Sequence, residues 1–346
     1  MVLRGFEARG AIGPRGFTRG NQSRAGAFRY RAPTSIPPEC DADHQERVRS
    51  RNKTLQKIKD SSRAWAEFGG NYQSMSEPHF AVASTFSPRF ESVIAEADCV
   101  ARLFGARLSV LHAGTRSDEK VALIREAFVG LEREEIDIYW CDGEKPATAL
   151  MDATVSEYFD LLIVGAISDS GESRNFTGGI VRELFTRTPC DLLLIPNPQE
   201  MPIVNPSACL LVEAHSPRWK SAIPTLRALN PSSISILAAD SPFAQARRAF
   251  SGTESEVNPL DEIQETLSEI TPDIDLRRVQ SNTGFILCDI IQDAVPDFIL
   301  VESEWKNGQR VLPPYLGWLE QIIPSRLFVF GKPPREVSHL NTPSSE

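Results

Sequence analysis

Two short stretches of this sequence recur in similar form, and this duplication limits the possible folds more than any other feature. Residues 160–164 read DLLIV, and residues 297–301 read DFILV. A Ser-Pro-Arg triplet followed by an aromatic residue stands at 87–90 and again at 216–219. The two offsets are 137 and 129 residues, and loop insertions in a duplicated domain produce differences of this size. We therefore predict a tandem repeat.

Within each half, short apolar runs alternate with segments of helical periodicity. Strands are expected at 79–84, 107–112, 136–141, 161–164 and 192–195 in the first half, and at 209–213, 234–238, 274–279, 298–301 and 327–330 in the second. Helices are expected between them, at 89–104, 119–131, 147–158 and 180–186, then at 221–229, 261–270, 285–294 and 316–323. Short continuous apolar runs indicate buried parallel strands, whose connections are right-handed crossovers. The predicted fold class is α/β: two tandem, open, five-stranded parallel sheets of the Rossmann-like type, with helices on both faces.

Composition divides the chain into five segments. Residues 1–77 form an Arg- and Gly-rich leader, which we expect to be disordered because it has few aliphatic residues and no periodicity. A first domain at 78–198, a linker at 199–205 and a second domain at 206–332 follow, and a polar, flexible tail at 333–346 ends the chain. Three interpretations of the leader stay open: a transit peptide, a nucleic-acid-binding tail, or residues upstream of a true translation start at Met75.

Charge and composition exclude several classes of protein. The net charge is −9, but residues 1–78 carry 14 Lys and Arg against 8 Asp and Glu, a net of +6, which leaves −15 for the body of the chain. An acidic body argues against nucleic acid as a partner, because nonspecific binding needs a basic surface. No apolar run approaches the roughly 18 residues that span a bilayer. The six cysteines form no Cys-x-x-Cys pair, so we expect buried thiols in a reducing, cytoplasmic compartment, no zinc and no membrane contact.

The segment between the fourth and fifth strands of the first half is the best candidate for an anion site. Gly165 ends one apolar run, and Gly178 and Gly179 precede the next helical segment. Glycines at a loop-to-helix junction let the backbone approach a phosphate, which the helix amides and dipole attract. Neither G-x-x-x-x-G-K-[ST] nor G-x-G-x-x-G is present. These residues alone therefore leave open whether the loop binds a ligand or only shapes the turn.

With these features together, both halves resemble the universal stress protein domain, here in tandem. GARLSVLHAG resembles the second strand of that family, DGEKPATALMDATVSEYFDLLIVG its third to fourth strands, and TPCDLLLIP its closing strand. The resemblance is stronger in the first half, and it implies a fold of the adenine nucleotide alpha hydrolase-like type. It also implies that the closing strands of two domains pair. We therefore expect residues 192–195 to lie antiparallel to 327–330, which makes the chain an intramolecular pseudo-dimer.

The resemblance also implies a set of phosphate-binding residues. ATP-binding members of the family carry a Gly-x2-Gly-x9-Gly-[Ser/Thr] loop. Here Gly165-x2-Ser168-x9-Gly178-Gly179 has the same spacing, with Ser168 in place of the second glycine and Gly179 in place of the hydroxyl residue. Losing that hydroxyl would remove one charge-assisted hydrogen bond to phosphate, worth about 1.5–3 kcal/mol.

Three further residues complete the predicted site. Thr85 takes the position of an Asp that ends the first strand in the family, which removes a charge but keeps a hydrogen-bonding oxygen. Ala113 ends the second strand, where the base would lie. Arg174, within the loop, could reach a phosphate. The implied ligand is ATP or AMP, with or without Mg²⁺.

The second half lacks this loop. Glu302 and Glu304 stand where a phosphate would lie, with Trp305 beside them, and like charges would repel a triphosphate. We therefore predict a structural or pairing role for this segment, and no nucleotide.

A few polar residues have two interpretations each. Arg89 and Arg218, which follow Ser-Pro in the two halves, predict either a shared salt bridge or an anion contact. His112 predicts either a contact to a base or a strand-end histidine that bonds to backbone. Glu96 and Asp98 are expected on the solvated face of a helix.

Two functions follow from these predictions. The first is a stress-response protein that binds ATP or another adenine nucleotide in its first domain as a sensor or regulator, with slow ATP hydrolysis at most. The second is a nucleotide-independent interaction or scaffold protein of the same fold, and a homo-oligomer or a protein partner is compatible with both. A third function, that of an adenylyl-transferring enzyme of a related α/β fold, is disfavoured because this sequence has no catalytic His or Lys motif after the first strand. Likeness of fold cannot decide among them.

Overall fold

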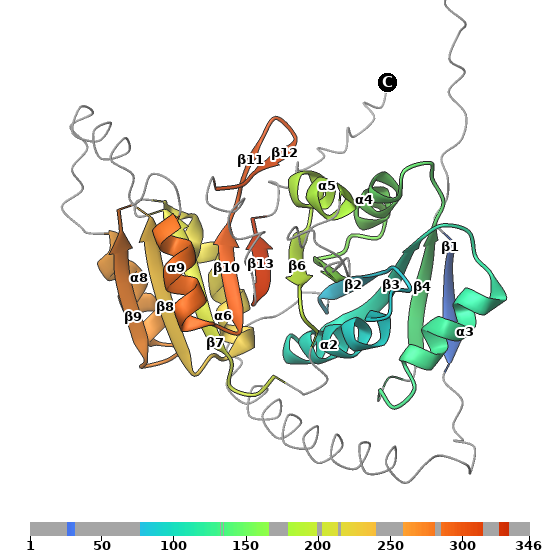
Figure 1. Cartoon of the computed structure of the whole chain (residues 1–346), viewed down its shortest axis with the longest axis horizontal. Coiled ribbons are helices and arrows are strands. Elements are labelled where there is room, and N and C mark those ends of the chain that lie inside the picture. The colour runs from blue at the N-terminus through green and yellow to red at the C-terminus, as the bar shows by residue number, and fades with distance from the viewer. Residues whose placement is uncertain are drawn as a thin grey trace, which may run out of the picture.

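The computed structural model shows one continuous sheet that runs through both halves of the chain, with helices on both of its faces (Figure 1). It describes residues 26–31, 77–131, 133, 135–165, 179–198, 203–213, 216–239, 259–280, 285–313 and 325–331. The eleven strands lie in the order β1-β4-β3-β2-β5-β6-β13-β10-β7-β8-β9. None of the described helices is long and apolar enough to cross a bilayer.

The first half contains five parallel strands in the order β4-β3-β2-β5-β6. These strands are β2 (His79–Ser84), β3 (Arg107–Ala113), β4 (Glu135–Cys141), β5 (Leu161–Gly165) and β6 (Asp191–Ile195). The helices α2 (Phe90–Leu103), α3 (Asp118–Ala127), α4 (Pro146–Ser156) and α5 (Gly179–Arg187) connect them. Apolar residues of α2 and α3 pack on one face of the sheet, and those of α4 and α5 pack on the other.

The second half repeats this order as β9-β8-β7-β10-β13. Its strands are β7 (Ser207–Glu213), β8 (Ser233–Ala239), β9 (Ile274–Val279), β10 (Phe298–Glu302) and β13 (Arg326–Phe330). The helical segments are η1 (Pro217–Ala222), α6 (Ile223–Leu229), α8 (Pro259–Ser268) and α9 (Phe285–Ala294). The α/β fold class and the duplication are thus confirmed, and the predicted helix at 316–323 lies outside the described residues.

The two halves meet edge to edge. β6 and β13 pair antiparallel, with Leu194 opposite Leu327 and Leu192 opposite Val329, as the sequence predicted. All four side chains are completely buried. Pairing these edges satisfies backbone groups that would otherwise invite aggregation. The two predicted sheets therefore form a single sheet.

A strand in the leader departs from the sequence-based prediction. β1 (Gly26–Arg31) pairs antiparallel with β4, from Gly26 opposite Trp140 to Arg31 opposite Glu135. The prediction of a disordered leader is wrong for these six residues, because the free edge of β4 offers a ladder of backbone hydrogen bonds. The rest of the leader before Glu77, and the tail at 333–346, lie outside the described residues.

The two acidic residues of α2 were predicted to be solvated, and this prediction is wrong. Glu96 is buried and forms an ion pair with Arg326, which comes from β13 of the other half. Asp98 is also buried, and it pairs with Arg102 at 2.9 Å and with Arg133. Each carboxylate is covered by a segment distant in the sequence, which helical periodicity cannot show.

His79, at the start of β2, is enclosed by polar and aromatic groups. Arg107 Nη2 donates to its Nδ1 at 2.9 Å, so the proton of the neutral ring lies on Nε2, which donates to Ser109 Oγ at 2.8 Å. The ring of Phe159 lies 4.3 Å away. Burial, together with the charge of Arg107, lowers the pKa of His79 to about 4.

Breaking the ion pair between the halves should destabilise the fold strongly. Glu96→Gln removes the close partner of the buried Arg326 charge and leaves it only Asp297 at 4.0 Å, and breaking a buried pair in this way costs about 3–5 kcal/mol. Urea unfolding of the full chain measures this loss. The double variant Glu96→Leu/Arg326→Met removes both charges and should recover most of it. A single variant as stable as the wild type would show that the pair contributes nothing.

The folded protein should lose stability in mild acid because of His79. Its pKa in the fold lies below the unfolded value of 6.5, so its contribution is fully present above pH 6.5 and is lost as the pH falls toward 4. The loss is at most about 3 kcal/mol. Urea unfolding at several pH values should show this fall in the wild type and a flatter profile in His79→Gln. Equal slopes would contradict the assignment.

Candidate functional site

The strand order places one candidate site in each half. In open α/β sheets, ligands bind at the carboxyl ends of the strands, where the strand order reverses. This point lies between β2 and β5 in the first half and between β7 and β10 in the second. The two switch points can therefore be compared within one chain.

At the first switch point, the structure brings together three of the predicted site residues. Thr85 directly follows β2 and is exposed, Ala113 ends β3, and Gly165 ends β5. Because β2 pairs in parallel with both β3 and β5, the three residues lie at the same edge of the sheet. Gly179, a fourth, is the first residue of α5. The remaining predicted residues lie outside the described part of the chain: Ser168, Arg174 and Gly178.

The surroundings of Gly165 exclude a side chain, whereas those of Gly179 do not. A Cβ on Gly165 would lie 2.8 Å from Cγ2 of Val93, so the packing of α2 against β5 excludes a side chain there. A Cβ on Gly179 would meet nothing within 4 Å among the described residues. No described group therefore restricts a side chain at Gly179, whereas Gly165 has a structural role whether or not a ligand binds.

An aromatic cluster lies beside Ala113, and sequence reasoning found only its histidine. The ring of His112 lies 4.7 Å from that of Phe86 and 5.2 Å, edge to face, from that of Trp140. His112 Nδ1 donates to the carbonyl of Ser84 at 3.3 Å, which supports the interpretation as a strand-end histidine. Burial and the nearby Lys120 lower its pKa, so the ring is neutral at pH 7. The missed signal was the aromatic residues at the ends of neighbouring strands.

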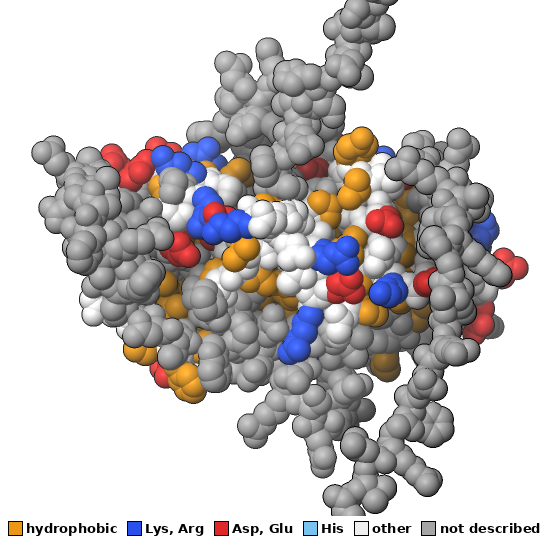
Figure 2. Space-filling view, turned by 90° about the horizontal axis from the view of Figure 1, so that it is seen from above, with side chains coloured by type: hydrophobic (Ala, Val, Ile, Leu, Met, Phe, Trp, Pro, Cys, Tyr) orange, Lys and Arg blue, Asp and Glu red, His pale blue; other side chains and the backbone are white. Residues whose placement is uncertain are grey.

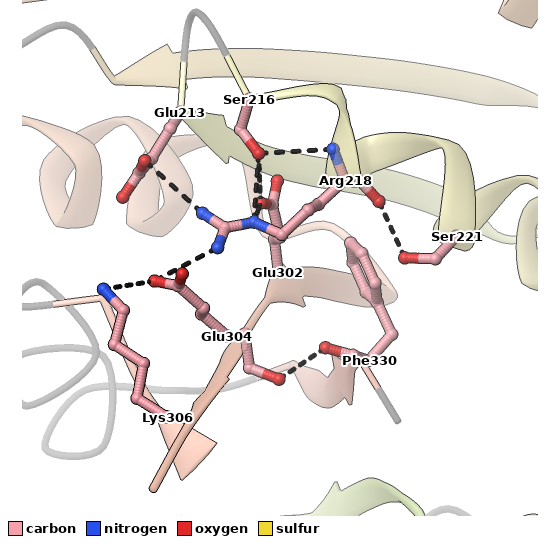
Figure 3. A network of polar contacts seen from close by, with 9 residues as sticks. Glu213, Ser216, Arg218, Ser221, Glu302, Glu304, Lys306 and Phe330 are labelled. Atoms are coloured by element: carbon pink, nitrogen blue, oxygen red, sulfur yellow. Dashed lines mark hydrogen bonds and ion pairs between the residues drawn. The ribbon is translucent and has the colours of Figure 1, made fainter. Parts of the chain in front are cut away.

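The second switch point is filled by the chain's own charges (Figure 3). The Arg218 guanidinium pairs with Glu302, with Glu304 at 3.2 Å and with Glu213 at 3.6 Å. Ser216 Oγ donates to Glu302 Oε1 at 2.6 Å. Burial raises the pKa of Glu302, although the hydrogen bonds from Ser216 and Arg218 oppose this shift. The salt-bridge interpretation of Arg218 is therefore confirmed.

Arg89, the matching arginine of the first half, does not form the shared salt bridge. Its Nη1 donates to the carbonyl of Pro196 at 3.1 Å. No carboxylate of the described residues is paired with it.

A hairpin stands where the second half would carry a glycine loop. It consists of β11 (Glu304–Lys306) and β12 (Gln309–Val311), and β12 contacts α5 of the first half. Trp305 Nε1 donates to the carbonyl of Gly331 at 2.6 Å, and the guanidinium of Arg310 lies 5.5 Å from the Trp305 ring. Arg310 Nη2 donates to the carbonyl of Cys190 at 2.6 Å. This segment therefore links the two halves, as the predicted structural role requires.

Charged side chains of both signs are mixed on one face of the molecule. On the face shown in Figure 2, acidic and basic side chains of the described residues are interspersed among hydrophobic ones, and no basic patch forms there. Among those residues, no cluster of His, Cys, Asp and Glu could hold a metal ion.

Solved structures with the same fold cover three quarters of this chain. A functionally unknown protein from Pseudomonas aeruginosa PAO1 superposes with a TM-score of 0.56, covering 75% of this chain and 93% of its own, at 11% identity. A universal stress protein from Archaeoglobus fulgidus DSM 4304 superposes with a TM-score of 0.56, covering 75% of this chain and 100% of its own, at 9% identity. No protein-family profile and no curated protein matches the sequence. The chain thus shares the fold of universal stress proteins.

A side chain at Gly165 should destabilise the first half. Gly165→Ala brings a methyl group against Val93 in a closely packed layer, and overpacking of this kind costs about 1–3 kcal/mol. Val93→Ala in the same chain should relieve the contact, so the two substitutions should be non-additive in urea unfolding. Additive effects would show that Val93 does not exclude a side chain there.

Proposed function

We propose that this protein is a universal stress protein-like stress-response protein that binds ATP or another adenine nucleotide at the first switch point. The fold it shares with universal stress proteins supports the class. The contrast between the two switch points carries the assignment to the first half. The second is occupied by the ion pairs of Arg218 with the buried Glu302 and the partly exposed Glu304, whereas no carboxylate of the described residues pairs with Arg89 at the first.

The proposed binding mode follows from the described groups. Phosphates would lie at the start of α5, where no described group contacts the side-chain position of Gly179 and the helix dipole favours negative charge. The base would lie at the ends of β2 and β3, near Thr85 and Ala113, where the rings of Phe86 and His112 offer an apolar wall. Mg²⁺ would enter with the phosphates, since it keeps several waters and uses phosphate oxygens as ligands.

The second half would then act as a structural partner of the first. Its closing strand completes the sheet, and its hairpin contacts α5, the helix proposed to hold the phosphates. The tandem chain would thus be its own pseudo-dimer. The proposed role is that of a sensor or regulator, with slow ATP hydrolysis at most.

One observation favours the alternative, a nucleotide-independent interaction protein. α9 begins with two large apolar side chains, Phe285 and Ile286, that are 51% and 49% exposed. Exposed apolar groups of this size are typical of contact surfaces. A chain that binds no nucleotide would act through such a surface.

A negative charge at the start of α5 should weaken nucleotide binding without unfolding the chain. Gly179→Asp places a carboxylate where phosphate is proposed, and we expect ATP affinity to fall about tenfold or more. The same charge favours the helix by about 0.3–1 kcal/mol, so the protein should stay folded. Equilibrium dialysis with labelled ATP on the full chain measures the change.

The matched control is Gly179→Asn, which has the same size and no charge and should bind more tightly than Gly179→Asp. Wild-type protein without saturable ATP binding below about 1 mM would refute nucleotide binding and favour the interaction protein. Equal affinity in the two variants would refute the location of the phosphates.

A further inference from the structure

The Ser-Pro-Arg triplet that the two halves share holds an anion in one of them. In the second half, Ser216 Oγ and Arg218 Nε both donate to the same carboxylate oxygen, Oε1 of Glu302. Ser216 Oγ also accepts from the backbone N–H of Arg218 at 3.2 Å, which orients the hydroxyl. Glu302 itself is only 4% exposed. The triplet and the turn after β7 thus form a preformed cradle for a carboxylate (Figure 3).

The strand registers identify the matching positions of the first half. Leu161 lies opposite Phe80, and Phe298 lies opposite Ala208, so the fourth strands align with an offset of 137 residues. At this offset Gly165 takes the place of Glu302. In the first strands the register aligns Thr85 with Glu213. Arg89 therefore has no counterpart of Glu213 and Glu302, the two strand-end carboxylates that pair with Arg218.

The packing beneath these positions has changed in a matched way. Gly165 leaves room for Val93 of α2, whose Cγ2 would lie 2.8 Å from an added Cβ. At the offset of the Ser-Pro-Arg triplet, Val93 corresponds to Ala222, a buried residue of η1, which packs against β10. The second half thus has a small helix residue and a large strand residue, and the first half has the reverse. The first half therefore has no carboxylate at this position, and the side chain of Val93 occupies the space beside Gly165.

Arg89 is placed to meet an anion from outside the chain. Its bond to the carbonyl of Pro196, just after β6, carries the side chain from the end of β2 across the end of β5, which lies between these strands. The guanidinium is therefore held at the carboxyl ends of these strands, the end of the sheet at which Gly165 also lies. Within the described part of the chain its one hydrogen bond uses Nη1, so Nε and Nη2 can still donate.

We infer that Ser87 and Arg89 form an anion-binding subsite of the first half, and that Glu302 is the chain's own substitute for that anion in the second. The ligand class is a phosphate or carboxylate bound through Arg89 Nε and Nη2 and the Ser87 hydroxyl. Its identity as a nucleotide phosphate rests on the proposed function, but the anion chemistry does not. The subsite adds to the first switch point two residues that are absent from the predicted phosphate loop.

Removing the charge of Arg89 should weaken the binding of anions selectively. For Arg89→Gln in the full chain we expect affinity for ATP and for inorganic pyrophosphate to fall about tenfold to a hundredfold, as expected for a lost charge-assisted hydrogen bond. Affinity for adenosine should be unchanged, because it has no anionic group. Arg125→Gln, an exposed arginine near the far end of α3, is the matched control and should leave all three affinities unchanged. Isothermal titration measures them.

A second variant copies the internal anion into the first half. Val93→Ala/Gly165→Glu should place a carboxylate on Arg89 and abolish pyrophosphate binding, whereas Val93→Ala alone should retain it. Circular dichroism confirms that each variant is folded. Pyrophosphate binding in the double variant equal to that of Val93→Ala would overturn the inference, as would an equal loss of adenosine and ATP affinity in Arg89→Gln.

The outcomes also separate the subsite from the proposed function. Wild-type protein that binds ATP with an affinity unaffected by Arg89→Gln would refute the subsite and leave the function standing. Wild-type protein that binds pyrophosphate through Arg89, but no adenine nucleotide, would support the subsite and refute the function. Binding of neither ligand would refute both.

Discussion

The antiparallel pairing of β6 with β13 is the contact on which the rest of the structure depends. It joins two sheets that would each end in an apolar edge, and leucines in the middle of both strands are completely buried there. Glu96 and Arg326 also form a buried ion pair between the two halves, and a buried charge without a partner is costly. Arg310 adds a hydrogen bond from the hairpin to Cys190. Each half therefore stabilises the fold of the other.

This mutual support gives the second half a structural role that needs no ligand. Its switch point is occupied by the ion pairs of Arg218 with Glu302 and Glu304. A site filled in this way contributes rigidity without a ligand. The hairpin that follows β10 contacts α5 of the other half. The two copies of the domain thus differ at the same point of the fold, where one has ion pairs and a hairpin and the other has glycines.

Prediction from the sequence succeeded where the signal is local. The ten strands of the two parallel sets were predicted from apolar runs, most of which are buried on both faces. Prediction failed at the hairpin strands β11 and β12, at Glu96 and Asp98, whose partners include residues distant along the chain, and at β1, which forms because β4 has a free edge. It gave Gly165 and Gly179 the same role, whereas one is required by packing and the other is open.

The sequence by itself determined the duplication and the α/β class, because repeats and apolar runs are properties of neighbouring residues, whereas the pairing of the closing strands was implied by the family resemblance. Only the tertiary structure showed which groups Arg89 and Arg218 contact. Whether the arginine of a Ser-Pro-Arg triplet meets a carboxylate or a backbone carbonyl depends on which strand ends lie beside it. The same local sequence therefore has different partners in the two halves, since charge interactions are set by distance in space and not along the chain.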